Sequence, residues 1–167
     1  MGREDWAGYN GVITADADGQ HGAADVCAVS QVLDRVADQI VLGVRNLRAE
    51  NVPTRSKLGN RVTSYIFHLL YGARLEDTQT GLRGIPRGLL EWNAAVKGER
   101  FEYEMNVLIS AVRDGIPFYS VPIETIYFDN NAGTHLTNIR DPWRIFLILL
   151  SGLGRYTGMA AFSAVVD

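Results

Sequence analysis

The chain has 167 residues, 47% of them hydrophobic and 21% charged, with a formal net charge of −3. This length favours one domain and is sufficient for a buried core. The acidic balance argues against general nucleic-acid binding, which favours a strongly basic surface, so no nucleic acid is expected as a partner. The single cysteine, Cys27, excludes an internal disulfide and a multi-cysteine zinc site. Its place on an apolar helical stripe predicts a small core residue.

Hydrophobic periodicity predicts strands and helices that alternate along the chain. The expected elements are a buried strand at 11–15, a helix at 25–37, a strand at 40–44, a basic loop at 45–58, a helix at 60–71, a turn-rich loop at 76–88, a helix at 102–114, and strand-like stretches at 118–121 and 123–128. The alternation predicts an α/β fold with some parallel sheet. Because the strands are few, we expect a partial domain that lacks its N-terminal half.

The C-terminal segment is strongly apolar and follows Asp141, which can cap a helix that begins at the next residue. A membrane span needs about 20 mostly apolar residues, and Arg155 interrupts the run. We therefore expect a membrane-interfacial helix at 142–153, followed by the start of a truncated membrane domain that ends at residue 167. Basic residues on both sides of the run suit an anionic cytoplasmic membrane face. A buried C-terminal helix of a soluble domain is the alternative.

The motif DADGQH occupies residues 16–21, directly behind the first predicted strand. Asp16 and Asp18 supply two carboxylates one residue apart. Mg²⁺ prefers oxygen ligands and typically uses one or two carboxylates together with the phosphates of a substrate. In open α/β sheets, ligands bind at the carboxyl ends of the strands. The motif therefore predicts a metal site for a nucleotide diphosphate, and the alternative is an Asx-rich turn that caps the next helix.

A basic segment follows the second predicted strand. Its cationic residues crowd one loop and the beginning of the next helix, and they are Arg45, Arg48, Arg55, Lys57 and Arg61. The arginine fork matches a phosphate bidentately, and the N-terminus of a helix adds a favourable field for an anion. The segment predicts phosphate binding, and a solvated basic loop is the alternative.

A third segment, LEDTQTGLRG at residues 75–84, places an acidic pair before a glycine-containing turn. Asp77 could orient an acceptor, deprotonate it, or hold the loop through hydrogen bonds to backbone amides, and the sequence leaves these roles open. Neither a Walker loop nor a G-x-G-x-x-G fingerprint occurs in the chain. This disfavours a metal- or nucleotide-binding regulatory domain.

Taken in order, six motifs resemble the family 2 glycosyltransferases that act on polyprenyl phosphates. They are DADGQH, GVRN, VPTRSKLGNR, DTQTGLRG, FEYEMNVLI and VPIETIYFDNNAGTHLTNIRDPWRI. Dolichyl-phosphate mannosyltransferases and undecaprenyl-phosphate glucosyltransferases belong to this family. The resemblance implies a GT-A, Rossmann-like fold, incomplete at its N-terminus, with residues 1–141 as the C-terminal portion of that domain.

The resemblance also implies a function. A glycosyltransferase of this kind moves one hexose, with inversion, from a nucleotide sugar of the UDP-glucose or GDP-mannose class to dolichyl or undecaprenyl phosphate. The reaction uses Mg²⁺ or Mn²⁺ at the cytoplasmic face of a membrane and serves cell-envelope glycan synthesis or protein glycosylation. A catalytically inactive fragment that acts only as a membrane-docking or phosphate-binding module is the alternative.

Family motifs carry roles over to single residues of this chain. The resemblance assigns Asp16, Asp18 and Gln20 to the metal, Asp16, Asp18, Arg45, Arg55, Arg83 and His135 to donor or phosphate binding, and Asp18 and Asp77 to catalysis. A surface-loop histidine is the alternative for His135. Because a lipid phosphate is already anionic, it needs little help from a base, and catalysis rests on positioning and charge neutralisation. We therefore expect Asp77 to position the reactants rather than to act as a strong base.

Overall fold

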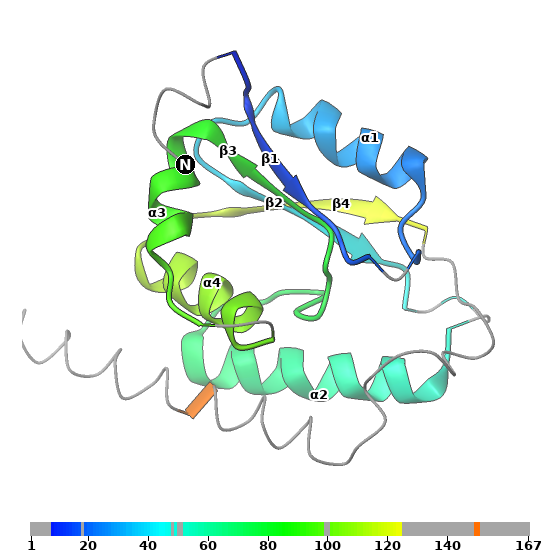
Figure 1. Ribbon diagram of the computed structural model, residues 1–167. Helices are drawn as coiled ribbons and strands as arrows, with labels where there is room; N and C mark the ends of the chain where they lie inside the picture. The colour runs from blue at the N-terminus through cyan, green and yellow to red at the C-terminus, as the bar shows by residue number, and fades with distance from the viewer. Residues whose placement is uncertain are drawn as a thin grey trace, which may run out of the picture.

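The computed structural model describes residues 8–17, 19–47, 49, 52–98, 101–124 and 149–150. Within these residues, one sheet lies between helices on both of its faces (Figure 1). The elements in chain order are β1 (Gly11–Thr14), α1 (Ala23–Leu33), β2 (Ile40–Arg45), α2 (Thr54–Tyr71), β3 (Arg83–Pro86), a 3-10 turn (Arg87–Leu89), α3 (Leu90–Ala95), α4 (Phe101–Arg113) and β4 (Phe118–Ile123). The predicted α/β class is confirmed.

The described strands form a four-stranded sheet in the order β1-β3-β2-β4. Strand β3 runs antiparallel to both β1 and β2, whereas β2 and β4 are parallel. Strands β1, β2 and β4 therefore point in the same direction, and their carboxyl ends meet at one edge of the sheet. The predicted parallel pairing is present between β2 and β4. Arg83, the first residue of β3, pairs with Thr14 and Leu42, so β3 begins near this same edge.

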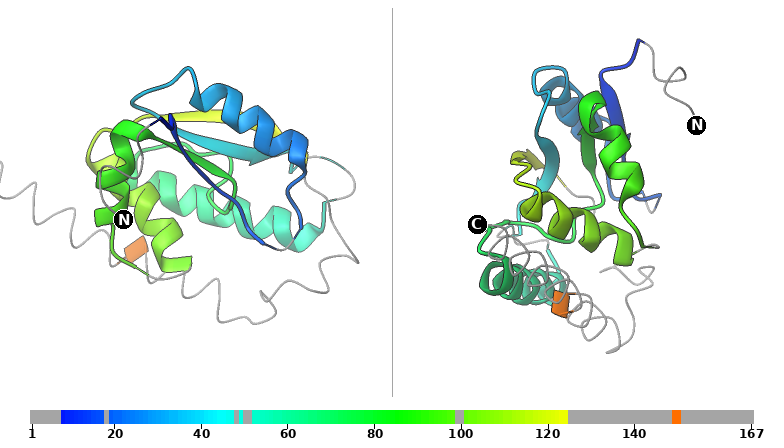
Figure 2. Two further views of the ribbon diagram at one scale, coloured as in Figure 1. Left: turned by 45° about the horizontal axis from the view of Figure 1, so that its top comes forward. Right: turned by 90° about the vertical axis from the view of Figure 1, so that its left-hand side faces the viewer.

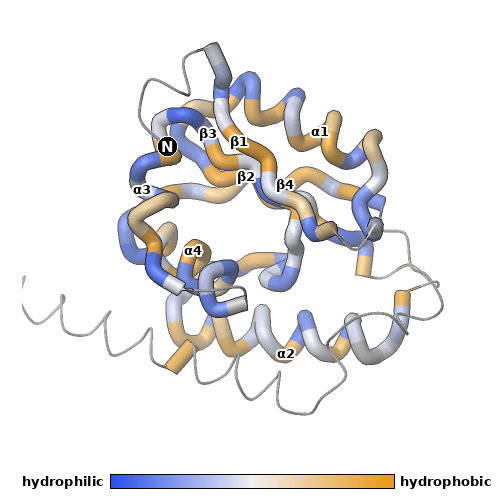
Figure 3. The backbone as a smooth tube through the Cα atoms, viewed as in Figure 1, coloured by the Kyte–Doolittle hydropathy of each residue, from blue (hydrophilic) through white to orange (hydrophobic). Residues whose placement is uncertain are grey.

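The helices form two layers, with α1 on one face of the sheet and α2 and α4 on the other (Figure 2). Alternate residues of β2 serve the two layers. Val41 packs in a cluster with Val29 of α1, whereas Leu42 packs in a cluster with Phe67 of α2 and Leu108 of α4. Both α1 and α2 alternate between hydrophilic and hydrophobic positions along the backbone, as expected for helices with one buried side (Figure 3).

Strand β3 is the main correction to the predicted elements, because it lies inside the expected turn-rich loop at 76–88. Its sequence, RGIP, contains glycine and proline, which usually mark turns. All four residues are buried. A Cβ atom on Gly84 would lie 3.2 Å from side-chain atoms of both Val29 and Val41, so this glycine allows α1 to pack closely on the sheet.

Several predicted boundaries and burial states were also wrong. Helix α2 begins at Thr54, so the last five residues of the expected basic loop are helical, and Pro53 precedes its first residue. Strand β4 continues through Pro122, which is tolerated because β4 is an outer strand among the described ones. Strand β1 is only half buried, since its residues alternate in exposure. Cys27 is exposed, because α1 turns Val29 and Leu33 rather than Cys27 toward the sheet.

In the C-terminal segment, the described residues are Leu149 and Leu150, which are helical. Leu149 is fully buried in the hydrophobic cluster that also contains residues of α2 and α4. The hydroxyl of Tyr71 donates a hydrogen bond of 2.5 Å to the carbonyl of Leu149. The expected division into residues 1–141 and 142–167 stays a prediction. Among the described residues, no helix combines the length and apolar character needed to cross a membrane.

Candidate functional site

Asp16, which follows β1, lies directly against Gly81. A side-chain carbon on Gly81 would overlap with the carboxylate of Asp16, so only glycine at this position leaves room for it. The first carboxylate of DADGQH therefore contacts the third sequence segment, LEDTQTGLRG. Helix α1 begins later, at Ala23, with Gly22 as its N-cap, and the carboxylate of Asp25, not one of the motif, accepts the N–H of Gly22 at 3.4 Å. Asp16 is thus not the helix cap that the alternative interpretation of the motif required.

Arg45 and Asp77 form a bidentate ion pair at the same edge of the sheet. The Nε and Nη2 groups of Arg45 donate to the two carboxylate oxygens of Asp77 at 2.6 and 2.8 Å. The backbone N–H groups of Arg45 and Gln79 donate to the same carboxylate at 3.4 and 3.1 Å. The Asp77 side chain is fully buried, and that of Arg45 is 13% exposed. With both oxygens occupied by donors, Asp77 is placed to fix Arg45, which favours the positioning role over that of a base.

Helix α2 and strand β2 hold the segment that carries Asp77. Asn60 of α2 donates to the carbonyl of Glu76 at 2.7 Å, and its side-chain oxygen accepts the backbone N–H of Thr78 at 3.0 Å. Thr80 donates its hydroxyl proton to the carbonyl of Gly43 at 2.5 Å. Sequence reasoning assigned no role to Asn60. No sequence signal pointed to it, because Asn60 is the first residue of the helix predicted at 60–71, where asparagine is a favourable cap.

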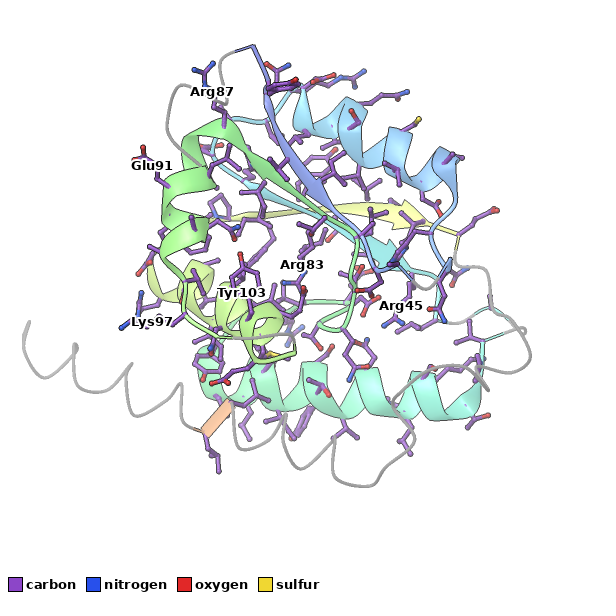
Figure 4. All side chains as sticks on the ribbon, in the orientation of Figure 1. Arg45, Arg83, Arg87, Glu91, Lys97 and Tyr103 are labelled. Atoms are coloured by element: carbon purple, nitrogen blue, oxygen red, sulfur yellow. The ribbon has the colours of Figure 1, made fainter. Side chains whose placement is uncertain are left out.

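Arg83 belongs to a second ion pair, in which the arginine is the buried partner. Its Nη2 lies 2.8 Å from Oε2 of Glu104, its Nη1 donates to the backbone carbonyl of Glu104 at 2.8 Å, and its Nε donates to the carbonyl of Thr80 at 3.1 Å. Figure 4 shows Arg83 between the sheet and α4, close to Tyr103. These contacts link the site segment to α4. The predicted contact of Arg83 with a phosphate stays a prediction.

Burial shifts the pKa values of Arg83 and Glu104 in opposite directions. Burial lowers the pKa of Arg83, and the nearby carboxylates of Glu104, Asp77 and Asp16 counteract that shift. Burial raises the pKa of Glu104, Arg83 opposes the shift, and the negative charge of Asp16 adds to it. The carboxylates of Asp16 and Glu104 therefore lie near enough to repel each other, and both are close to the guanidinium of Arg83. Sequence reasoning missed Glu104, although it lies in the quoted motif FEYEMNVLI.

Three predicted site residues lie wholly or partly outside the described residues. Asp18 and His135 lie outside the described residues, and the side chain of Arg55 does too, although its backbone belongs to α2. Gln20 is described and half buried. Within the described part of the chain, no three histidine, cysteine or acidic residues group as metal ligands. The metal site made from Asp16, Asp18 and Gln20 therefore stays a prediction.

Two curated proteins are similar to this chain. A UDP-N-acetylglucosamine–dolichyl-phosphate N-acetylglucosaminyltransferase from Methanococcus voltae is 32% identical over 142 residues, which are 83% of this chain and 56% of that protein. An uncharacterized protein from Methanocaldococcus jannaschii is 30% identical over 136 residues, or 75% of this chain and 54% of that protein. The chain thus spans about half the length of the curated relatives it matches. No protein-family model and no solved structure gave a significant match.

The similarity agrees with the motif resemblance at a coarse level. It is a similarity to a glycosyltransferase that uses dolichyl phosphate, and the mixed sheet with helices on both faces is consistent with a Rossmann-like fold of such enzymes. This relative does not support the more specific expectation of a mannosyltransferase or glucosyltransferase, because its name specifies N-acetylglucosamine.

Proposed function

We propose that this chain is part of a glycosyltransferase that moves a sugar from a nucleotide donor to a polyprenyl phosphate. The observation that carries the proposal is the cluster at the carboxyl ends of the parallel strands. There, Asp16 follows β1 and lies against Gly81, while Arg45 at the end of β2 is held by buried Asp77. A fixed guanidinium and an exposed carboxylate at the same edge of the sheet suit a site that binds both phosphate groups and a cation.

The chemistry needs positioning more than acid–base assistance. An anionic oxygen of the lipid phosphate attacks the anomeric carbon of the sugar, a new C–O bond forms, and the bond to the nucleoside diphosphate breaks with inversion. Arg45, oriented by Asp77, would orient a phosphate oxygen for this step. Neutralisation of the departing diphosphate is the role for Mg²⁺ or Mn²⁺ when bound. Asp16, Asp18 and Gln20 would hold that ion.

The donor, the acceptor and the location are parts of the same proposal. The relative from Methanococcus voltae supports a nucleotide sugar and a dolichyl-type acceptor, which makes UDP-N-acetylglucosamine the first donor to test, with UDP-glucose and GDP-mannose as comparisons. A polyprenyl acceptor requires a membrane, and we place the reaction at its cytoplasmic face. Arg55, Arg83 and His135 are further candidates for contacts with the phosphates.

Isothermal titration of the chain with each of the three donors, with and without Mn²⁺, tests the donor side. Metal-dependent binding of one donor is expected. A folded sample that binds none of them would contradict a donor site in this chain. For the acceptor side, Arg45→Lys keeps the charge but loses the bidentate fork, and it should weaken binding of a short-chain polyprenyl phosphate by about tenfold. Arg87→Lys, at an exposed position on the 3-10 turn, is the control.

A further inference from the structure

Helix α2 carries a row of large apolar side chains that face solvent. Leu58, Val62, Tyr65 and Leu69 are 62, 48, 67 and 68% exposed. Their spacing of four, three and four residues places them on one side of the helix. The opposite side is buried against the core through Asn60, Thr63, Phe67 and Tyr71. Single exposed apolar residues are ordinary, whereas a continuous row of this length indicates an interaction surface. We call this row the α2 stripe.

Positive charge accompanies the α2 stripe. Helix α2 has 18 residues, and it contains Arg55, Lys57 and Arg61 but no aspartate or glutamate. Helical spacing places the exposed Arg61 beside the stripe, three residues after Leu58 and four before Tyr65, whereas the half-buried Lys57 lies one turn before Arg61 and farther from the stripe. The chain as a whole is acidic, with a net charge of −3, so this basic and apolar side of one helix contrasts with the rest of the molecule.

We propose that the α2 stripe docks on the surface of an anionic membrane. Apolar side chains flanked by basic ones are the arrangement with which a helix lies in the headgroup region of a bilayer. Leu58, Val62, Tyr65 and Leu69 insert among the lipids, while Arg61 meets the anionic headgroups. Each basic residue near such a surface strengthens binding by about fivefold. A second copy of the chain fits less well, because pairing two stripes would bring the basic residues of both helices together.

The proposal deepens the proposed function by giving the site an orientation toward the lipid. Asn60, on the buried side of α2, holds the backbone at Glu76 and Thr78, next to Asp77. The helix that contacts the membrane on one side therefore fixes the Arg45–Asp77 pair on the other. The test below uses neither a donor nor a polyprenyl phosphate, so docking and sugar transfer can fail separately.

An environment-sensitive fluorophore reports insertion at single positions, and the single cysteine makes this practical. The test protein is the 167-residue chain with Cys27→Ser and Leu69→Cys, labelled at position 69. The control is the unaltered chain labelled at Cys27, which is exposed on α1 across the sheet from α2. Vesicles of phosphatidylcholine with phosphatidylglycerol should shift the emission to the blue at position 69 but not at 27. Added salt and the omission of phosphatidylglycerol should both reduce the shift.

Two results would overturn the proposal. In the first, the chain sediments with anionic vesicles but the label at position 69 does not shift, which would place the membrane contact elsewhere. In the second, the label shifts without vesicles as the protein concentration rises, and analytical ultracentrifugation finds a dimer. The occupant of the α2 stripe would then be a second copy of the chain.

A matched pair of charge reversals provides an independent measurement. Arg61→Glu, beside the stripe, should weaken co-sedimentation with anionic vesicles at least fivefold. Arg87→Glu makes the same change in net charge at an exposed position outside α2 and should leave binding nearly unchanged. Circular dichroism confirms that both variants fold. Equal losses in the two variants would indicate non-specific attraction, and no loss in either would remove the role of α2; both outcomes contradict the proposal.

Discussion

Two ion pairs flank the same segment of the chain, and they are built in opposite ways. In the Arg45–Asp77 pair the acid is fully buried and the arginine is 13% exposed, whereas in the Arg83–Glu104 pair the arginine side chain is 4% exposed and the acid 36%. The first pair therefore presents a held cation toward the sheet edge, and the second presents an acid. In each pair, the more accessible partner is held in place by the buried one, which suits it to binding a ligand. In the proposed site, this contrast would let one short segment contact both an anionic and a cationic ligand.

Asp77→Asn tests the first pair and should have the largest effect. The change keeps the size of the side chain but removes the charge that Arg45 needs in a largely buried environment. Breaking one partner of a buried pair costs about 3–5 kcal/mol in the free energy of unfolding. Urea denaturation followed by circular dichroism measures it. Glu104→Gln, at the more exposed acid, should cost clearly less, and an equal or larger cost there would contradict the contrast between the two pairs.

Gly81→Ala tests whether Asp16 belongs with the two pairs. The added methyl group would overlap with the Asp16 carboxylate and displace it, at an overpacking cost of about 1–3 kcal/mol. Metal-dependent donor binding should weaken along with stability, as titration would measure. Gly59→Ala is a suitable control, because its added carbon would meet nothing closer than 3.9 Å and replaces a glycine within α2. That variant should gain roughly 0.5–1 kcal/mol. If Gly81→Ala keeps full donor binding, the contact between Gly81 and Asp16 has no role in the site.

Glu104→Gln also removes a small dependence of stability on pH. Burial raises the pKa of Glu104 in the folded protein above its value in the unfolded chain, so the folded state binds the proton more tightly. The corresponding stability is fully present below the unfolded pKa and is lost as the pH rises through the folded pKa. The Glu104→Gln variant should not lose stability in this way as the pH rises. Denaturation midpoints of both proteins across that pH range provide the comparison, and parallel curves would exclude the effect.

The elements were predicted correctly where the periodicity of the apolar side chains matches their burial in the structure. Strand β2 is buried on both faces and the apolar residues of α4 repeat at helical spacing, so both were found within a residue or two. Strand β3 was missed because its glycine and proline resemble a turn, and only the close approach of α1 explains the glycine. Cys27 was misplaced because spacing alone does not decide which side of a short helix faces the sheet.

The sequence by itself determined the α/β class. It named Asp16 and Arg45 as candidates through their positions after strands, Asp77 through the acidic pair before a glycine-containing turn, and Arg83 through the family resemblance. Only the tertiary structure decided how they combine. Arg45 and Asp77 are 32 residues apart in the chain. Strand pairing and the hydrogen bond from Asn60 to the carbonyl of Glu76 bring them together. The same holds for Arg83 with Glu104 and for Asp16 with Gly81. The local pattern of apolar residues reflects the period of a helix or a strand. These contacts depend instead on the order of the strands in the sheet, which residues close together in the sequence do not specify.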